Sequence, residues 1–184
     1  MPTGPSYPRQ IESARLILRA PTLADLEQLF RIESDPRTNT FNPAGPYQHL
    51  EQAETILARW LTHWHERGFG PWAISARQQA HTIIGFGGLA YSLHFGPEPK
   101  INLGYRFDTS AWGMGLGTEL ACTAVSFGFE TLQLDEIFAK VRENHLASRR
   151  VLEKAGLQPS GRLDDVPGAA HSIVYRVGRE VVRA

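Results

Sequence analysis

The sequence has little cysteine and no net charge, and each of these absences excludes a class of protein. The single cysteine, Cys122, cannot form an internal disulfide, and the chain has neither a CxxC pair nor a Cys/His cluster. No structural zinc site or other metal site is therefore expected. Lysine and arginine number 19 and aspartate and glutamate number 19, so no overall basic field attracts a nucleic-acid backbone. We expect no nucleic-acid partner.

Long apolar runs are also absent. No stretch approaches the ~18 consecutive apolar residues typical of a membrane-spanning helix, and the first residues are polar and rich in proline, unlike a secretory signal. We expect a protein of the cytoplasm that has no membrane partner.

What is present predicts one mixed α/β domain. Of the 184 residues, 42% are hydrophobic, which is enough for a core without disulfides. Residues 1–10 contain three prolines and predict a flexible N-terminal arm, whereas 11–184 form the domain. Apolar periodicity predicts strands and helices that follow one another along the domain. Strands are expected at 15–19, 70–77, 82–93, 101–107, 137–141, 157–163 and 172–182, and helices at 22–32, 50–68, 115–132 and 144–155.

A glycine-rich loop follows the strand at 101–107 and precedes a predicted helix. It contains Gly113, Gly115 and Gly117 at alternate positions. Glycines in this place let several backbone N–H groups point into one concavity, where the helix dipole favours an anion. The loop predicts a phosphate site, although glycines in this pattern can also make only a tight turn.

Two nucleotide-binding motifs can be tested against this loop by spacing. A Walker loop ends in Gly-Lys-Ser/Thr, but Thr118 follows Gly117 directly. A dinucleotide fingerprint needs GxGxxG and an acidic residue that closes the second strand. Here the third glycine comes one residue early, and Asp135 and Glu136 precede the next apolar run instead of ending it. The spacing therefore disfavours ATP and NAD.

The segment from Trp112 to Glu119 resembles the pyrophosphate loop of the GNAT superfamily of N-acetyltransferases, with its pattern (Arg/Gln)-x-x-Gly-x-(Gly/Ala). Leu103-Gly-Tyr105, Trp112-Gly113 and Asn144-x-x-x-Ser148-x-x-Val-Leu-Glu-Lys-x-Gly156 are similar to its RimJ/RimL-like branch. The resemblance extends over about residues 11–182. It implies a single-domain GNAT fold, an α/β architecture with a mixed, mostly antiparallel sheet of about six to seven strands flanked by about four helices.

The resemblance implies an enzyme that transfers an acetyl group from acetyl-CoA to a primary amine by direct attack in a ternary complex. The acceptor would be a protein N-terminal α-amine or a small-molecule amine, and a homodimer is expected from relatives alone. The main chain of Phe107 and Asp108 would pair with the pantetheine arm, Asn144 would hydrogen-bond it, and Arg149 would reach a CoA phosphate. Donors to the pyrophosphate would be the amides of Gly113, Met114, Gly115, Leu116, Gly117 and Thr118. Asn144 is equally suited to be a helix N-cap.

Two residues are candidates for catalysis by resemblance. Ser148 would lie beside the CoA sulfur and protonate the departing thiolate. Asn102 stands where many relatives carry a glutamate base; an amide cannot accept a proton at neutral pH and could only position a water molecule. The lack of an obvious base leaves a second function open, a non-catalytic acyl-CoA-binding or sensing domain. Trp112 stands where the superfamily pattern has Arg or Gln, although Trp is common in this branch. Met114 stands where a basic residue is frequent, so this loop has less positive charge.

Overall fold

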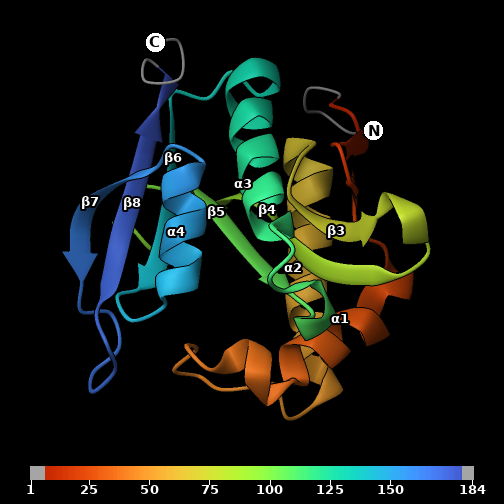
Figure 1. Cartoon of the computed structure of the whole chain (residues 1–184), viewed down its shortest axis with the longest axis horizontal. Coiled ribbons are helices and arrows are strands. Elements are labelled where there is room, and N and C mark those ends of the chain that lie inside the picture. The colour runs from red at the N-terminus through yellow and green to blue at the C-terminus, as the bar shows by residue number, and fades with distance from the viewer. Residues whose placement is uncertain (1–6, 180–184) are drawn as a thin grey trace. The chain divides into compact units, whose positions relative to one another are not determined.

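The computed structural model describes residues 7–179, and its strands form an eight-stranded mixed sheet in the order β1-β2-β3-β4-β5-β6-β8-β7 (Figure 1). Strands β5 and β6 run parallel, while the β1–β2, β2–β3, β3–β4, β6–β8 and β7–β8 pairs run antiparallel. The strands are β1 (Gln10–Glu12), β2 (Leu16–Arg19), β3 (Pro71–Ala76), β4 (Ile83–Ser92), β5 (Lys100–Phe107), β6 (Glu136–Arg142), β7 (Gln158–Leu163) and β8 (Ser172–Gly178). The α-helices are α1 (Leu26–Ser34), α2 (Leu50–Arg67), α3 (Leu116–Ser126) and α4 (Leu146–Lys154).

The α/β class, the mixed sheet and the helices are confirmed, but the strand count is higher than expected. The additional strand is β1, whose three residues pair with β2. It begins at Gln10, and the carbonyl of Arg9 accepts a hydrogen bond from Ala20 at 2.7 Å. Residues 1–6 of the predicted arm lie outside the described residues.

The chain is divided into two compact units, which are described separately. The first unit comprises the residues up to Gly88 together with 105–116, and the second comprises 89–104 together with the residues from Gly117 onward. Across residues 7–179, no helix is both long and apolar enough to cross a membrane.

In the first unit, α1 and α2 share a core with β3 and β4. Helix α2 carries its apolar side chains at helical spacing and ends at Gly68, which adopts a left-handed conformation with φ of 75° and donates to the carbonyl of Trp64. Trp72 and Trp64 are buried, and the ring of Trp60 packs 5.8 Å from that of Phe86. The buried members of this core are Leu29, Ile32, Ala53, Leu57, Ala73, Ile83 and Phe86.

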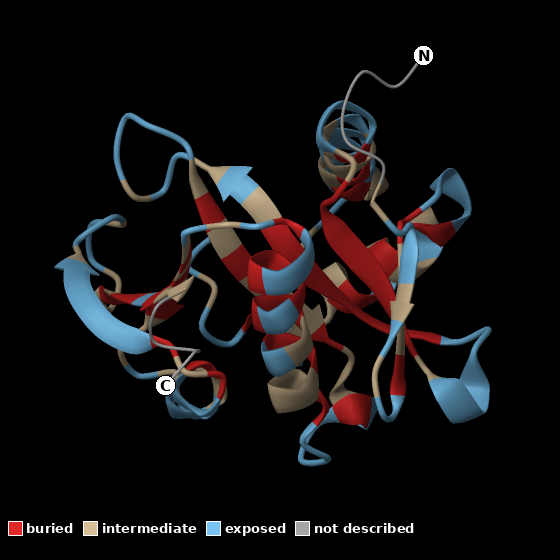
Figure 2. Cartoon of the chain, turned by 90° about the horizontal axis from the view of Figure 1, so that it is seen from above, coloured by how far each residue is buried: buried red, intermediate tan, exposed pale blue. Residues whose placement is uncertain are grey.

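In the second unit, β6 pairs with β8 along its whole length, and β7 follows at the edge of the sheet. Strand β7 is exposed over most of its residues, as its pale blue ribbon shows in Figure 2. Helix α3 passes into a π-helical turn at Phe127–Thr131, where one α-helix was expected through 132. Helix α4 ends before Gly156, whose φ of 90° is the left-handed conformation predicted for it.

Candidate active site

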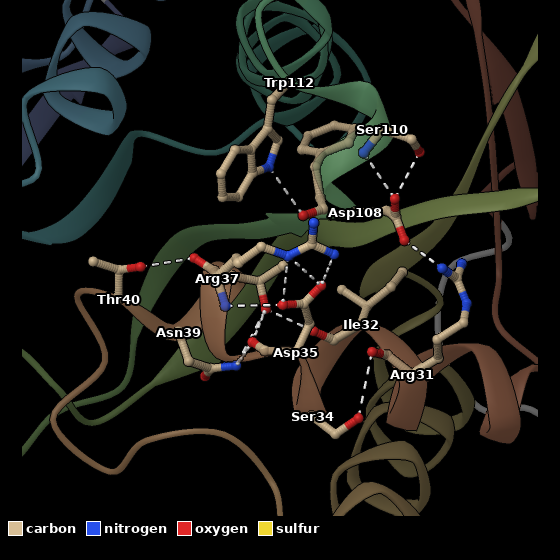
Figure 3. Close-up of polar contacts among 12 residues, drawn as sticks. Arg31, Ile32, Ser34, Asp35, Arg37, Asn39, Thr40, Asp108, Ser110 and Trp112 are labelled. Atoms are coloured by element: carbon tan, nitrogen blue, oxygen red, sulfur yellow. Dashed lines mark hydrogen bonds and ion pairs between the residues drawn. The ribbon is translucent and has the colours of Figure 1, made fainter.

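The end of β5 and the glycine loop form one locally ordered segment of the first unit (Figure 3). After Phe107, the carboxylate of Asp108 caps a 3-10 turn by accepting hydrogen bonds from the Ser110 N–H at 2.8 Å and the Ser110 hydroxyl at 2.6 Å. The indole N–H of Trp112 then donates back to the Phe107 carbonyl at 3.2 Å. These contacts fix the point at which the chain leaves the sheet and enters the loop.

Residues 112–115 of the loop are exposed, and two of its three glycines adopt the left-handed conformation found in nests of amides. Gly113 and Gly115 have φ of 73° and 75°, in the left-handed region. Among the described turn and loop hydrogen bonds, none is donated by the amides of residues 113–115. The first N–H groups of α3, which begins at Leu116, have no acceptor within the helix. This run of amides can hold an anion; that it holds the CoA pyrophosphate stays a prediction.

The main chain predicted to bind pantetheine is partly occupied. The N–H of Asp108 donates to the carbonyl of Ile84 at 2.8 Å, and the Phe107 carbonyl already accepts from Trp112. A carbonyl oxygen has two lone pairs. The second lone pair of the Phe107 carbonyl therefore has capacity for a ligand. So has that of the Asp108 carbonyl, which accepts from the Ala111 N–H at 3.0 Å.

Helix α1 and β5 are joined by an arginine that the sequence analysis missed. Arg31 forms an ion pair with the Asp108 carboxylate and donates to the Ile83 carbonyl at 3.2 Å. Burial alone would raise the pKa of Asp108, but hydrogen bonds from Ser110 and Arg31 hold that pKa below its usual value. Asp108 is therefore an anion, and its carboxylate is committed to the turn and to α1.

A second arginine, Arg106 of β5, joins that strand to the end of α1 and the turn that follows it. Arg106 donates to the Glu33 carboxylate at 2.6 Å and to the side-chain oxygen of Asn39. Asn39 is buried and its amide donates to the carbonyls of Glu33 and Asp35 at 2.8 and 2.9 Å. Burial raises the pKa of Glu33, and the charge of Arg106 opposes that rise. This cluster fixes the segment between α1 and α2 against β5.

The remaining predicted site residues lie in the second unit. Asn102, half-buried on β5, pairs in register with Phe138 of β6. Asn144 is exposed and lies just before the helix α4, whose N-cap is His145. The N-cap alternative for Asn144 is therefore wrong, because the helix begins one residue later than that role requires. Ser148 is half-buried in the first turn of α4.

Arg149 is engaged within the protein. Its Nε donates to the Tyr175 hydroxyl at 3.1 Å and its Nη1 donates to the Glu143 carbonyl at 3.0 Å. The Tyr175 hydroxyl donates in turn to the Glu153 carboxylate at 2.8 Å. Arg149 therefore braces α4 against β8, and only the rest of its guanidinium is left for a phosphate.

No metal-binding group complicates this arrangement: between residues 7 and 179, no cluster of three or more His, Cys, Asp or Glu side chains could hold an ion. Asp135 and Glu136 lie at the start of β6, the end at which a dinucleotide fold does not place its ribose-binding acid.

The mixed sheet and the glycine loop that joins strand β5 to helix α3 agree with the fold that the sequence resemblance implies. The family model described as the acetyltransferase (GNAT) domain matches residues 15–158, and the chain belongs to this family. The uncharacterized N-acetyltransferase YoaA of Bacillus subtilis strain 168 is 30% identical over 155 residues, which cover 83% of this chain and 85% of YoaA.

Solved structures agree with the family. An acetyltransferase from Agrobacterium tumefaciens strain C58 superimposes with a TM-score of 0.75 at 26% identity and covers 94% of this chain and 95% of its own. The spermidine N-acetyltransferase of Vibrio cholerae, solved with CoA and spermine, has a TM-score of 0.75 at 16% identity over 94% of this chain and all of its own, 100%. At that identity the second likeness shows the fold alone.

Proposed function

We propose that the protein transfers the acetyl group of acetyl-CoA to a primary amine, as an N-acetyltransferase of the cytoplasm. The observation that carries this proposal is the loop at 113–116, with two left-handed glycines and amides that no other loop contact uses. Family membership supports the donor, because GNAT acetyltransferases use acetyl-CoA. The relative YoaA, which is described as an N-acetyltransferase, supports an amine as the acceptor.

The proposed reaction needs a neutral amine, a stabilised oxyanion and a proton for sulfur. The amine nitrogen bonds to the thioester carbon and the C–S bond breaks. The thiolate takes its proton from the Ser148 hydroxyl, which regains a proton from solvent. The amine proton leaves to solvent through a water molecule that Asn102 positions, because the Asn102 amide is not itself a base. The direct attack within a ternary complex leaves no acetyl group on the protein.

The acceptor class divides into protein N-termini and small amines. An α-amino group, with a pKa near 8, is neutral far more often at physiological pH than a lysine amine with a pKa of about 10.4. An acceptor of that kind suits a site without a carboxylate base. The RimJ/RimL-like motifs at 103–105 and 144–156 support a protein N-terminus, which we propose as the first acceptor to test; polyamines are the second.

The test is release of free thiol from acetyl-CoA by the purified protein, in the presence of peptides with different N-termini, spermidine or single amino acids. Turnover with at least one amine, above the rate of acetyl-CoA with protein alone, is expected. Tight CoA binding with no turnover on any amine would contradict the proposal and favour the acyl-CoA-sensing alternative.

Ser148→Ala is expected to lower kcat about 100-fold, the scale on which a positioned general acid contributes. The affinity for CoA should stay near the wild-type value, because the change removes one hydroxyl group. Stopped-flow single-turnover measurements isolate the chemical step, and Ser160→Ala on β7 is the matched control in the same unit. An unchanged single-turnover rate in Ser148→Ala would show that another group protonates the thiolate.

A further inference from the structure

The glycine loop carries no positive charge of its own. Between Trp112 and Leu116 its residues are Trp112, Met114, Leu116 and two glycines. Trp112 and Met114 are about half exposed, at 51% and 56%. Backbone amides contribute only partial charges to an anion, about half an elementary charge at a helix N-terminus. A pyrophosphate group bound there would keep most of its charge unless a cation arrived from another segment.

Arg15 is a cation that comes from another segment of the first unit. It is exposed and directly precedes β2, and its Nη1 donates to the carbonyl of Met114 at 2.8 Å. Its Nη2 lies 3.6 Å from the position that a Cβ on Gly115 would occupy. Both terminal nitrogens of the guanidinium are therefore placed along the loop, beside the amides proposed to hold the anion.

The backbone at Arg15 is held where this reach requires it. The carbonyl of Arg15 accepts a hydrogen bond from the N–H of Arg77 at 2.8 Å, just beyond the paired residues of β2 and β3. The side chain of Arg77 takes a different course, because its guanidinium donates to the Ser13 carbonyl at 3.3 Å and pairs with Glu12 at 3.5 Å. Of these two neighbouring exposed arginines, it is Arg15 whose side chain contacts the loop.

We propose that Arg15 is a phosphate-binding residue of the CoA site and contacts the pyrophosphate from its position just before β2. The inference rests on the proposed function. A guanidinium has five N–H donors in a planar fork, so a donor on the Met114 carbonyl does not prevent another donor from turning to a phosphate oxygen. The hydrogen bond to the Met114 carbonyl also favours the phosphate contact, because a carbonyl oxygen that accepts from Arg15 is not turned toward the anion. Arg15 in this way supplies a positive charge that the side chains of Trp112 and Met114 do not.

The experiment compares three ligands by calorimetry: CoA, dephospho-CoA, which keeps the pyrophosphate but lacks the 3′-phosphate, and acetyl-pantetheine, which has no phosphate. Arg15→Gln is expected to weaken CoA and dephospho-CoA alike, roughly 10- to 100-fold, the effect of losing a hydrogen bond between charged groups. Acetyl-pantetheine should bind both proteins equally. The CoA affinity of the wild type should also fall more steeply with salt than that of Arg15→Gln.

Two further variants test whether the effect depends on the position and the charge of Arg15. Arg77→Gln removes the same charge one strand away and should bind CoA as the wild type does, whereas Arg15→Lys should recover part of the lost affinity and of the salt dependence. Equal CoA affinity of Arg15→Gln and the wild type would overturn the inference. So would an Arg15→Gln variant that binds CoA more weakly but dephospho-CoA normally, or one whose affinity for acetyl-pantetheine falls as much as its affinity for CoA. Failure of the wild type to bind CoA would instead overturn the proposed function.

Discussion

Gly115→Glu is expected to weaken CoA binding more than 100-fold while the protein stays folded. The substitution places a carboxylate among the amides proposed to bind the pyrophosphate. The carboxylate and the pyrophosphate are both anions, so they would repel each other at close range. The new side chain would also begin 3.6 Å from Nη2 of Arg15, so it would take up the cation that we assign to the phosphate. Calorimetric titration with CoA measures the loss, and thermal unfolding of the apo protein reports folding.

Backbone strain must be separated from charge in this variant. Any side chain at φ of 75° costs about 1 kcal/mol, and Gly115→Ala carries that strain without the charge. Gly168→Glu is the matched control for both, because Gly168 has φ of 78° and nothing within 4 Å of its Cβ position. We expect Gly168→Glu to bind CoA normally and Gly115→Ala to lose only a few-fold in affinity. Equal affinities of Gly115→Glu and Gly168→Glu would place the pyrophosphate elsewhere.

Local sequence signals predicted most of the elements. Helix α2 has an apolar stripe at helical spacing and a glycine at its end, and it runs from Leu50 to Arg67 with Gly68 left-handed. Strand β1 was missed because its three residues, Gln-Ile-Glu, are mostly exposed and too few to establish an alternation, and only pairing with β2 makes them a strand. The π-helical turn after α3 was missed because apolar spacing does not distinguish it from an α-helix; there Gly128 lets the Ile137 side chain approach, to 2.7 Å from its Cβ position.

The candidate site likewise has a part that the local sequence predicts and a part that it does not. The glycine loop was predictable because glycines between a strand and a helix are a local pattern. Arg15, Arg31 and Arg106 were not, because each acts on a partner 99, 77 or 73 positions away along the chain. An arginine in a strand or helix has the same local signal whether it faces solvent or a carboxylate. Only the fold brings such groups together, and no spacing rule could have identified Glu33 as the partner of Arg106.

Arg106→Met is expected to lower the free energy of unfolding by about 3 kcal/mol at neutral pH, the lower end of the range for breaking a buried ion pair. The pair is well enclosed, with the side chains of Arg106 and Glu33 only 25% and 13% exposed. Methionine keeps the apolar stem but leaves the Glu33 carboxylate and the Asn39 oxygen without their donor. Urea denaturation measures the loss. Arg37→Met, which breaks the exposed pair with Asp35, should change stability little.

The loss in Arg106→Met should depend on pH, with a sign that follows from Glu33. Burial raises the pKa of Glu33 and Arg106 opposes this rise, so removing Arg106 should raise the pKa further. A carboxyl group whose pKa is higher in the folded state binds its proton more tightly there. The stability it contributes is therefore present at low pH and is lost as the pH rises through the folded-state pKa. The deficit of Arg106→Met should be smaller at about pH 5 than at about pH 8.

Glu33→Gln completes the test, because an amide cannot ionise. Added to Arg106→Met, it should recover much of the lost stability at neutral pH, since removing both charges of a buried pair costs far less than removing one. The double variant should also lose the pH dependence between about pH 5 and about pH 8 that distinguishes Arg106→Met from the wild type. A deficit that Glu33→Gln leaves unchanged, and that is equal at both pH values, would assign the stabilisation to the Asn39 contact of Arg106 instead of its ion pair.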